Sequence, residues 1–375
     1  MKNKDHYKIL VERYLSGELT KEELVLFMQL TKKGVLDEHL QAAMDKDLPD
    51  SLPQSIPVNK PFYKTTSFHW IAATILITLL ISIFLIPNKT DLQRYPTNAA
   101  AVQPGSNKAT LTLANGEQIL LDTTHRAGFE HIPSIDDQQS KTGALVYRAQ
   151  KNSAGALVYN TLTVPENGQF HMVLSDGSKI WLNAASSLKY PIAFDTKERI
   201  VELIGEAYFE IAPDVNRPFL VKTANQQVNV LGTDFNLMAY PDEDVIETAL
   251  ISGKVQVRDT TFHNPIVLTP GTKLRFNKRT AKRNTETFDP EEVIAWKNGN
   301  FLFNETPLKE ILPKLARWYA VKIDASYLPD IRYNGFISRN VPLSKVLKMM
   351  EETGDIKFAF EGNTIKIDNQ MKLPM

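Results

Sequence analysis

Residues 170–183 read FHMVLSDGSKIWLN, in which two short runs of alternating apolar and polar residues flank Asp176-Gly177. Alternation with a period of two is typical of a strand with one buried face, and an Asp-Gly pair between two such runs predicts a β-hairpin. Residues 109–122, ATLTLANGEQILLD, repeat the pattern around Gly116. We expect both stretches to form hairpins closed by type I′ turns.

The same alternation extends over residues 109–285. In residues 201–211, VELIGEAYFEI, apolar and small residues occupy every second position, and Glu202, Glu206 and Glu210 share the opposite face. We interpret these glutamates as solvated side chains on the outer face of a strand, rather than as groups for acid–base catalysis. Many short strands at this spacing predict an all-β sandwich or roll.

Residues 293–370 show a different periodicity. After a short strand, Thr306-Pro307 predicts an N-cap followed by proline at the first helical position. Apolar residues then recur at helical spacing before a further strand, and the unit repeats from Pro342. This predicts a duplicated β-α-β unit in a small α+β domain. Pro313 lies inside the first helix, where proline costs about 3 kcal/mol unless the helix bends.

A long apolar segment precedes these regions. Residues 68–86 read FHWIAATILITLLISIFLI, nineteen residues in which His69 is the only ionisable group. At a rise of about 1.5 Å per residue a helix of this length spans roughly 28 Å, which matches the hydrocarbon core of a bilayer. The segment lies too far along the chain to be a secretory signal. We therefore predict one transmembrane helix at residues 67–87.

The charges beside the predicted helix leave its orientation open. Lys60 and Lys64 lie on one side, and Lys89 and Arg94 lie on the other. Because topology follows the excess of Lys and Arg on the cytoplasmic side, this near tie predicts neither orientation.

Residues 1–47 contain no strand-like alternation, and their apolar residues recur at helical spacing. About 45 residues of short helices bury little core. The segment is therefore either a loose helical hairpin or, as we favour, a module that completes its fold against a partner. The apolar residues that we expect at the partner surface are Leu10, Tyr14, Leu15, Leu24 and Phe27.

Composition and missing motifs exclude several classes of function. Lys+Arg and Asp+Glu both number 43, so the chain lacks the basic excess of a nucleic-acid-binding protein. There is no cysteine, which excludes disulfides, thiolate metal sites and a cysteine nucleophile. Metallopeptidase, serine-hydrolase and nucleotide-binding motifs are missing, and the spacing of His125 and His131 suits a metal poorly. We expect no enzyme activity, no cofactor and no metal.

Three stretches resemble a known family. Residues 176–191, DGSKIWLNAASSLKYP, residues 205–212, GEAYFEIA, and residues 217–240, RPFLVKTANQQVNVLGTDFNLMAY, closely resemble the periplasmic domain of FecR-type anti-sigma factors of the Bacteroidetes.

Both ends of the chain extend this resemblance. Residues 296–323 and 337–358 look like the C-terminal domain of such proteins, which is itself similar to the short N-terminal domain of secretins and TonB-dependent receptors. Residues 13–24, RYLSGELTKEEL, look like the start of the family's sigma-binding helices.

The resemblance implies a single-pass protein of the inner membrane, with its N-terminus in the cytoplasm and its C-terminus in the periplasm. It implies control of an extracytoplasmic-function sigma factor in response to a TonB-dependent outer-membrane receptor, without direct contact with nucleic acid. Whether the receptor senses an iron chelate or a glycan is left open. The expected order is a helical sigma-binding module (1–47), a Pro-rich tether (48–66), the transmembrane helix (67–87), a periplasmic linker (88–108), a FecR-type β domain (109–285) and a βαβ signalling domain (293–370).

Two other classes of protein would also carry an anchor and a β domain. A membrane-anchored periplasmic β protein could bind glycan or envelope components without an intracellular partner. A tethered hydrolase would need a pair of carboxylates on a concave surface.

Gly232-Thr233, within VLGTDFNL, carries one covalent hypothesis. A threonine hydroxyl that attacks the preceding carbonyl produces an ester by an N→O acyl shift, and water can then cleave the ester. Self-cleavage reported for some relatives of the FecR type supports this reading. The alternative is that Gly232 marks a bulge and Thr233 occupies a strand. Gly271-Thr272 predicts an ordinary turn and serves as an internal control.

Overall fold

The computed structural model describes residues 102–122, 132–136, 144–148, 157–259, 262–354 and 356–367. The chain separates at Pro87 into two units, and every described residue belongs to the second, Asn88–Met375. The predicted helical module, tether and transmembrane helix lie outside the described residues, and the domain boundaries given above stay predictions. Within the described part of the chain, no helix combines the length and the apolar character needed to cross a membrane.

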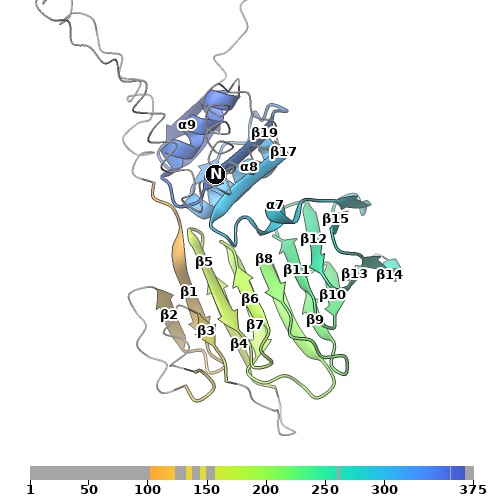
Figure 1. Ribbon diagram of the computed structural model, residues 1–375. Helices are drawn as coiled ribbons and strands as arrows, with labels where there is room; N and C mark the ends of the chain where they lie inside the picture. Colours follow the sequence, from red (N-terminus) through yellow and green to blue (C-terminus); the bar gives the residue numbers. More distant parts are fainter. Residues whose placement is uncertain are drawn as a thin grey trace, which may run out of the picture. The chain divides into compact units, whose positions relative to one another are not determined.

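Sixteen strands form two sheets that face each other, and we call them together the β domain (Figure 1). The first sheet contains, in spatial order, β2 (Gln118–Asp122), β1 (Ser106–Thr112), β4 (Tyr159–Val164), β7 (Ser186–Pro191), β8 (Arg199–Glu210), β9 (Phe219–Lys222), β10 (Gln226–Val230), β13 (Val255–Asp259) and β14 (Phe262–Leu268). The second contains β3 (Leu145–Val146), β5 (Gly168–Val173), β6 (Lys179–Leu182), β8 again, β11 (Asp234–Ala239), β12 (Val245–Ser252), β15 (Thr272–Asn277) and β16 (Arg283–Thr287).

Strand β8 belongs to both sheets and changes partners at Gly205. Residues 199–204 pair with β9 and β7, whereas residues 205–210 pair with β11 and β6. Gly205 has a φ of 94°, and a Cβ atom there would lie 2.4 Å from the hydroxyl oxygen of Ser186. Glycine is therefore required where β8 crosses β7.

The hydrophobic core of the β domain lies between the two sheets. The alternate residues Val201, Leu203, Ala207 and Phe209 of β8 are all buried there, as the alternation predicts. Phe209 stacks on Phe235 of β11 with ring centroids 4.8 Å apart. Burial of each such aliphatic or aromatic side chain contributes about 1.5–3 kcal/mol, and the prediction of an all-β sandwich is confirmed.

Both predicted hairpins form, but the type I′ turns are wrong. Strands β1 and β2 pair antiparallel, as do β5 and β6. Positive φ occurs at Gly116 and Gly177 but not at the residue before either glycine, where a type I′ turn requires it. Instead each glycine amide donates to the carbonyl three residues earlier, on Leu113 and Leu174. Such longer loops, in which a left-handed glycine follows the turn, also close hairpins.

The C-terminal domain has its own hydrophobic core and follows the short helix α7 (Pro290–Ile294). Its elements are β17 (Asn300–Pro307), α8 (Leu308–Tyr319), β18 (Lys322–Ile323), β19 (Arg332–Ser338), α9 (Leu343–Thr353), β20 (Phe358–Glu361) and β21 (Thr364–Ile367). Strands β17 and β19 pair antiparallel, and β18 and β20 flank β21. The predicted β-α-β order therefore occurs twice, but the two strands of each unit lie in different sheets.

Helix α8 begins one residue later than predicted. Pro307 is the N-cap and Leu308 the first helical residue, whereas Thr306 still belongs to β17. The Thr306 hydroxyl accepts from the amide of Asn304 instead of capping the helix. The helix continues through Pro313.

Candidate functional site

The predicted site residues fall into two groups. Leu10, Tyr14, Leu15, Leu24 and Phe27 lie outside the described residues, so the partner surface stays a prediction. Gly232 and Thr233 are described, and they connect β10 to β11.

The Gly232–Thr233 turn is bonded on both sides to a neighbouring loop, residues 211–217. The amide of Asp214 donates to the carbonyl of Leu231 at 2.8 Å, and the amide of Ile211 donates to the carbonyl of Thr233 at 3.1 Å. A Cβ atom on Gly232 would lie 2.8 Å from Cα of Pro213 in the same loop. Packing alone therefore requires glycine at this position.

The Thr233 side chain is held by the connection between β12 and β13. Thr233 is 3 % exposed, and its hydroxyl donates to the backbone carbonyl of Lys254 at 3.1 Å. Gly253 precedes Lys254 with a φ of 87°. A Cβ atom on Gly253 would lie 2.8 Å from the Gly232 carbonyl oxygen and 2.9 Å from the Thr233 hydroxyl oxygen. Gly253 thus lies so close to the bond that self-cleavage would break that no side chain fits there, and the sequence pattern did not indicate this.

The alternative reading, in which Thr233 occupies a strand, is wrong in that detail, because Thr233 lies in the connection between β10 and β11. Self-cleavage stays a prediction. Among the described residues, the acceptor for the Thr233 hydroxyl is a backbone carbonyl rather than an acid or base side chain. The register between β11 and β12 shifts directly after Asp234, as a bulge does. The control pair lies at an ordinary turn, as expected, in which the Thr272 hydroxyl donates to the carbonyl of Thr269 at 2.6 Å.

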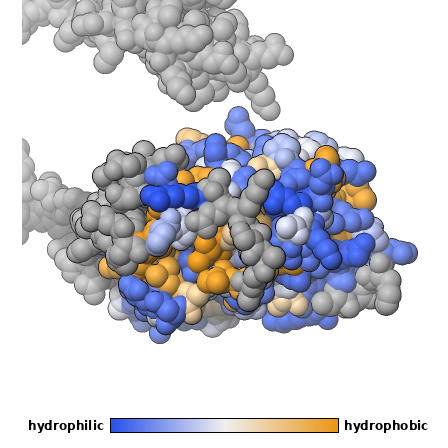
Figure 2. Space-filling view, turned by 90° about the horizontal axis from the view of Figure 1, so that it is seen from below, coloured by the Kyte–Doolittle hydropathy of each residue, from blue (hydrophilic) through white to orange (hydrophobic). Residues whose placement is uncertain are grey.

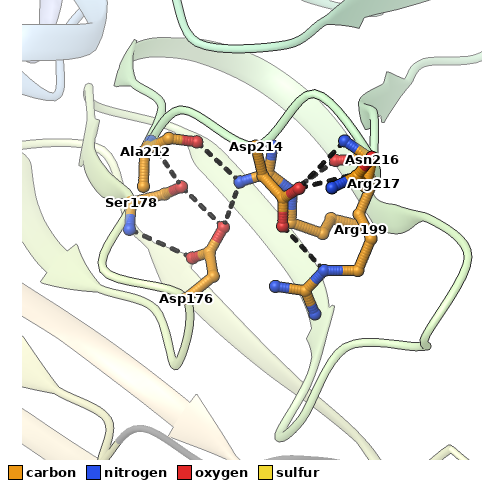
Figure 3. Close-up of polar contacts among 7 residues, drawn as sticks. All are labelled: Asp176, Ser178, Arg199, Ala212, Asp214, Asn216 and Arg217. Carbon is orange, nitrogen blue, oxygen red and sulfur yellow. Dashed lines mark hydrogen bonds and ion pairs between the residues drawn. The ribbon is translucent and has the colours of Figure 1, made fainter.

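A buried ion pair fixes the loop beside the turn (Figure 3). Arg199 donates through Nη1 to Oδ2 of Asp176 and to the carbonyl of Ala212, both at 2.8 Å. Ser178 links the same groups, because its hydroxyl donates to Asp176 at 2.7 Å and accepts from the amide of Ala212 at 3.1 Å. The two charged side chains are 1 % and 4 % exposed. The first residues of the loop are therefore tied to the hairpin turn at Gly177.

The far half of the loop is closed by Asp214 (Figure 3). Its Oδ1 accepts from the amides of Asn216 and Arg217 at 3.1 and 3.2 Å, and its Oδ2 accepts from Nε of Arg217 at 2.8 Å. The hydrogen bond from Arg217 lowers the pKa of the Asp214 carboxyl below its usual value. The loop that flanks Gly232 is thus internally braced.

Two large apolar residues are exposed beside the turn. Figure 2 views the molecule from below and shows apolar atoms gathered amid polar ones. Val215 and Leu231, which border the Gly232–Thr233 turn, are among the exposed large apolar residues. Water can therefore reach the turn, although the Thr233 side chain is buried.

A second polar cluster lies where the β domain meets the C-terminal domain. Glu206, expected to be solvated, is only 9 % exposed. Its carboxylate accepts from the amide nitrogens of Asn183 at 2.8 Å and of Asn236 at 3.0 Å. A carboxylate only accepts, so both amides must turn their oxygens outward. The Oδ1 atom of Asn236 accepts from the indole of Trp296 at 3.2 Å, and the Oδ1 atom of Asn183 accepts from Arg339 at 2.9 Å.

Arg339 belongs to the C-terminal domain and is almost fully buried. It also donates to the carbonyl of Trp296 at 2.9 Å, and its guanidinium carbon lies 3.7 Å from the ring centroid of Trp318. Burial lowers the pKa of Arg339 to about 10.

Arg317 of α8 pairs with an acidic turn of the β domain. Its Nη1 and Nη2 lie 2.8 Å from Glu243 and 2.9 Å from Asp242, and its guanidinium carbon lies 3.7 Å from the ring centroid of Tyr240. Beside these contacts lies a groove of about 470 Å³, lined by polar and apolar residues of both domains. Arg275 and Glu310 join its two walls at 2.9 Å.

Trp181 does not offer the open ring face that glycan binding would need. Lys297 Nζ lies 4.0 Å from the ring centroid of Trp181, so an ammonium group covers the indole face that a sugar would need. Within the described ranges, no three His, Asp or Glu residues are grouped so that they could hold a metal ion.

Comparisons with known proteins agree on two segments of the chain. Residues 160–256 match the family model described as FecR protein, and residues 300–367 match the model described as FecR, C-terminal. The first match contains the Gly232–Thr233 turn and Glu206, and the second contains Arg317 and Arg339. No curated protein sequence matches the chain significantly.

Two crystal structures of a candidate anti-sigma factor from Parabacteroides distasonis ATCC 8503, at 1.65 and 2.50 Å resolution, are similar to this chain. Each is 28 % identical with a TM-score of 0.52, and the match covers 56 % of this chain and 98 % of the solved one.

Proposed function

We propose that this chain, which belongs to the FecR family of anti-sigma factors, is a single-pass transducer of the inner membrane. It controls an extracytoplasmic-function sigma factor in response to a TonB-dependent outer-membrane receptor. The observation that carries the proposal is the presence, in one chain, of both FecR segments and an apolar run long enough to span a bilayer. The family and the solved neighbour point to a regulatory protein rather than an enzyme.

The proposed topology places residues 1–66 in the cytoplasm and the β and C-terminal domains in the periplasm. Reporter fusions after Lys64 and after Lys108 test it, because each reporter is active in only one compartment. We expect a cytoplasmic signal from the first fusion and a periplasmic signal from the second. The reverse pattern contradicts the proposal.

The proposed cytoplasmic partner is a sigma factor that receives the apolar stripe of the N-terminal module, as an amphipathic helix fills a groove. A pull-down with residues 1–66 as bait tests this contact. We expect mass spectrometry to recover a sigma factor. A bait that is soluble and recovers none would contradict the proposed contact.

The proposed periplasmic partner binds the C-terminal domain by strand addition. In the described residues β19 pairs with β17 alone, so its other edge presents free backbone groups. Phe336 of β19 is 66 % exposed and offers an apolar anchor beside that edge. Deletion of residues 293–375 should uncouple the sigma response from the receptor, and normal induction by the truncated chain would contradict this role.

A further inference from the structure

Residues 102–105, which we call the strap, lead into β1 of the β domain but lie against the C-terminal domain. The carbonyl of Val102 accepts from the amide of Leu343, the first residue of α9, at 3.2 Å. The Val102 side chain contacts the core of the C-terminal domain. A Cβ atom on Gly105 would lie 2.6 Å from the ring of Trp318, so the strap backbone lies directly on this indole.

The β domain fixes the other end of the strap. Ser106 follows the strap, begins β1 and donates its amide to the carbonyl of Asn167 at 3.2 Å. Asn167 in turn donates its own amide to the carbonyl of Arg317, at the end of α8, at 2.8 Å. The strap therefore bridges two bodies whose positions must match for both ends to stay bonded.

Polar contacts between the two domains hold them in the relative position that the strap needs. Arg317 binds Asp242 and Glu243 of the β domain, and Arg339, whose guanidinium lies against Trp318, binds Asn183. We call these contacts the latch. Charged pairs that water can reach contribute little, and interfaces between domains of one chain resemble transient complexes. Asp242 has a side chain that is 72 % exposed, so at least this pair is screened.

We propose that the latch is releasable, and that its release also frees the strap, so that an event on the C-terminal domain reaches the segment preceding β1. This inference rests on the proposed role as a transducer and assigns its conformational step. The geometry gives the reason: Gly105 is one residue from the anchored Ser106, so the indole of Trp318 moves off it when the domains part. The bond from Leu343 to Val102 then loses its support.

Hydrogen exchange of the purified full-length chain, without sigma factor or receptor, tests the proposal at three amides. Asn167 reports the contact between the domains, Leu343 reports the strap, and Ser106 reports the root of the strap in β1. The variant Asp242→Lys with Glu243→Lys places two lysines against Arg317. We expect exchange at Asn167 and Leu343 to rise on the order of tenfold, with Ser106 unchanged.

Two controls make the result specific. Asp244→Lys changes the same turn, but Asp244 pairs with Arg279 inside the β domain at 2.7 Å and should leave all three amides protected. Protection of buried Leu347, in the middle of α9, shows that the C-terminal domain stays folded.

Continued protection of Leu343 when Asn167 exchanges faster would overturn the proposal, because the strap would then follow the C-terminal domain. Unchanged exchange at Asn167 would overturn it too, because the latch would not be releasable. Neither outcome depends on sigma binding, so failure of this inference is distinguishable from failure of the proposed function.

Discussion

Arg199 and Arg317 perform similar chemistry in different settings. Each binds carboxylate oxygen at 2.8–2.9 Å, and each guanidinium lies over an aromatic ring, Phe219 or Tyr240. The Asp176 partner of Arg199 is 4 % exposed, whereas the Asp242 partner of Arg317 is 72 % exposed. Arg199 also joins strands of one domain, whereas Arg317 joins two domains.

This difference in exposure suits the first ion pair to holding the fold together and the second to a contact that can be broken. Removal of one partner from a buried pair leaves an uncompensated charge inside the protein, so the first pair can break only when the β domain unfolds. Water can solvate the groups of the second pair as they separate. The end of the β domain near Gly232 is therefore built as a fixed frame, and the end near the C-terminal domain as a contact that can open.

The buried pair gives the largest expected effect. Asp176→Ala should lower the free energy of unfolding of the β domain by about 3–5 kcal/mol, because Arg199 keeps its charge without a partner. Glu202→Ala removes the exposed partner of Lys189 and should cost about 1 kcal/mol or less. Urea unfolding followed by tryptophan fluorescence measures both. Equal losses would contradict the contrast between buried and exposed pairs.

Gly253→Ala should cost less, about 1–3 kcal/mol, from a strained φ together with contact against the Gly232–Thr233 bond. Gly271→Ala is the matched control, since Gly271 has a φ of 80° but no atom within 4 Å of the added Cβ. Thermal unfolding of both variants separates backbone strain from crowding. A larger loss at Gly271 would show that the contact with the turn carries no weight.

Glu206→Gln tests the face toward the C-terminal domain. A glutamine offers one acceptor where Asn183 and Asn236 both donate, so one amide loses its partner or turns over. The expected cost is about 1–2 kcal/mol, accompanied by faster amide exchange at Asn167. Glu202→Gln, at an exposed position of the same strand, should leave exchange at Asn167 unchanged. A silent Glu206→Gln variant would mean that the two asparagines need no ionised acceptor.

Thr233→Ala gives the smallest effect on stability, about 0.5–1.5 kcal/mol, for the lost hydrogen bond to Lys254. It also tests self-cleavage, which stays a prediction. If the acyl shift occurs, mass spectrometry of the purified chain should find a new N-terminus at Thr233, and the variant should remain intact. An intact wild-type chain after long incubation would leave Gly232 and Thr233 with the packing roles described above.

Sequence periodicity predicted the parts of the fold that depend on local burial. The alternation in β8 and the helical spacing after Pro342 identified real elements, because each pattern follows from one buried face. Glu206 was placed on the solvated face, because alternation does not report what covers the outer side of a strand. The C-terminal domain, which is remote in sequence, packs on this face and contributes Arg339, which binds Asn183.

The contacts of the site could not be predicted for a similar reason. Gly253 approaches Gly232 only once β10 has paired with β13. Asp176, in the turn between β5 and β6, reaches Arg199 at the start of β8 only in the folded domain. A glycine between strands and an aspartate in a turn both have ordinary local explanations. Only the three-dimensional register brings these residues together.

The most direct test of the central claim is co-isolation of the sigma factor with the full-length chain from membranes. The variant Leu15→Asp with Leu24→Asp serves as the comparison, because it adds charge to the predicted partner surface and leaves the described domains untouched. The account predicts that mass spectrometry finds a sigma factor with the wild-type chain and loses it with the variant. A wild-type chain that is present in the membrane and carries no sigma factor would contradict the account.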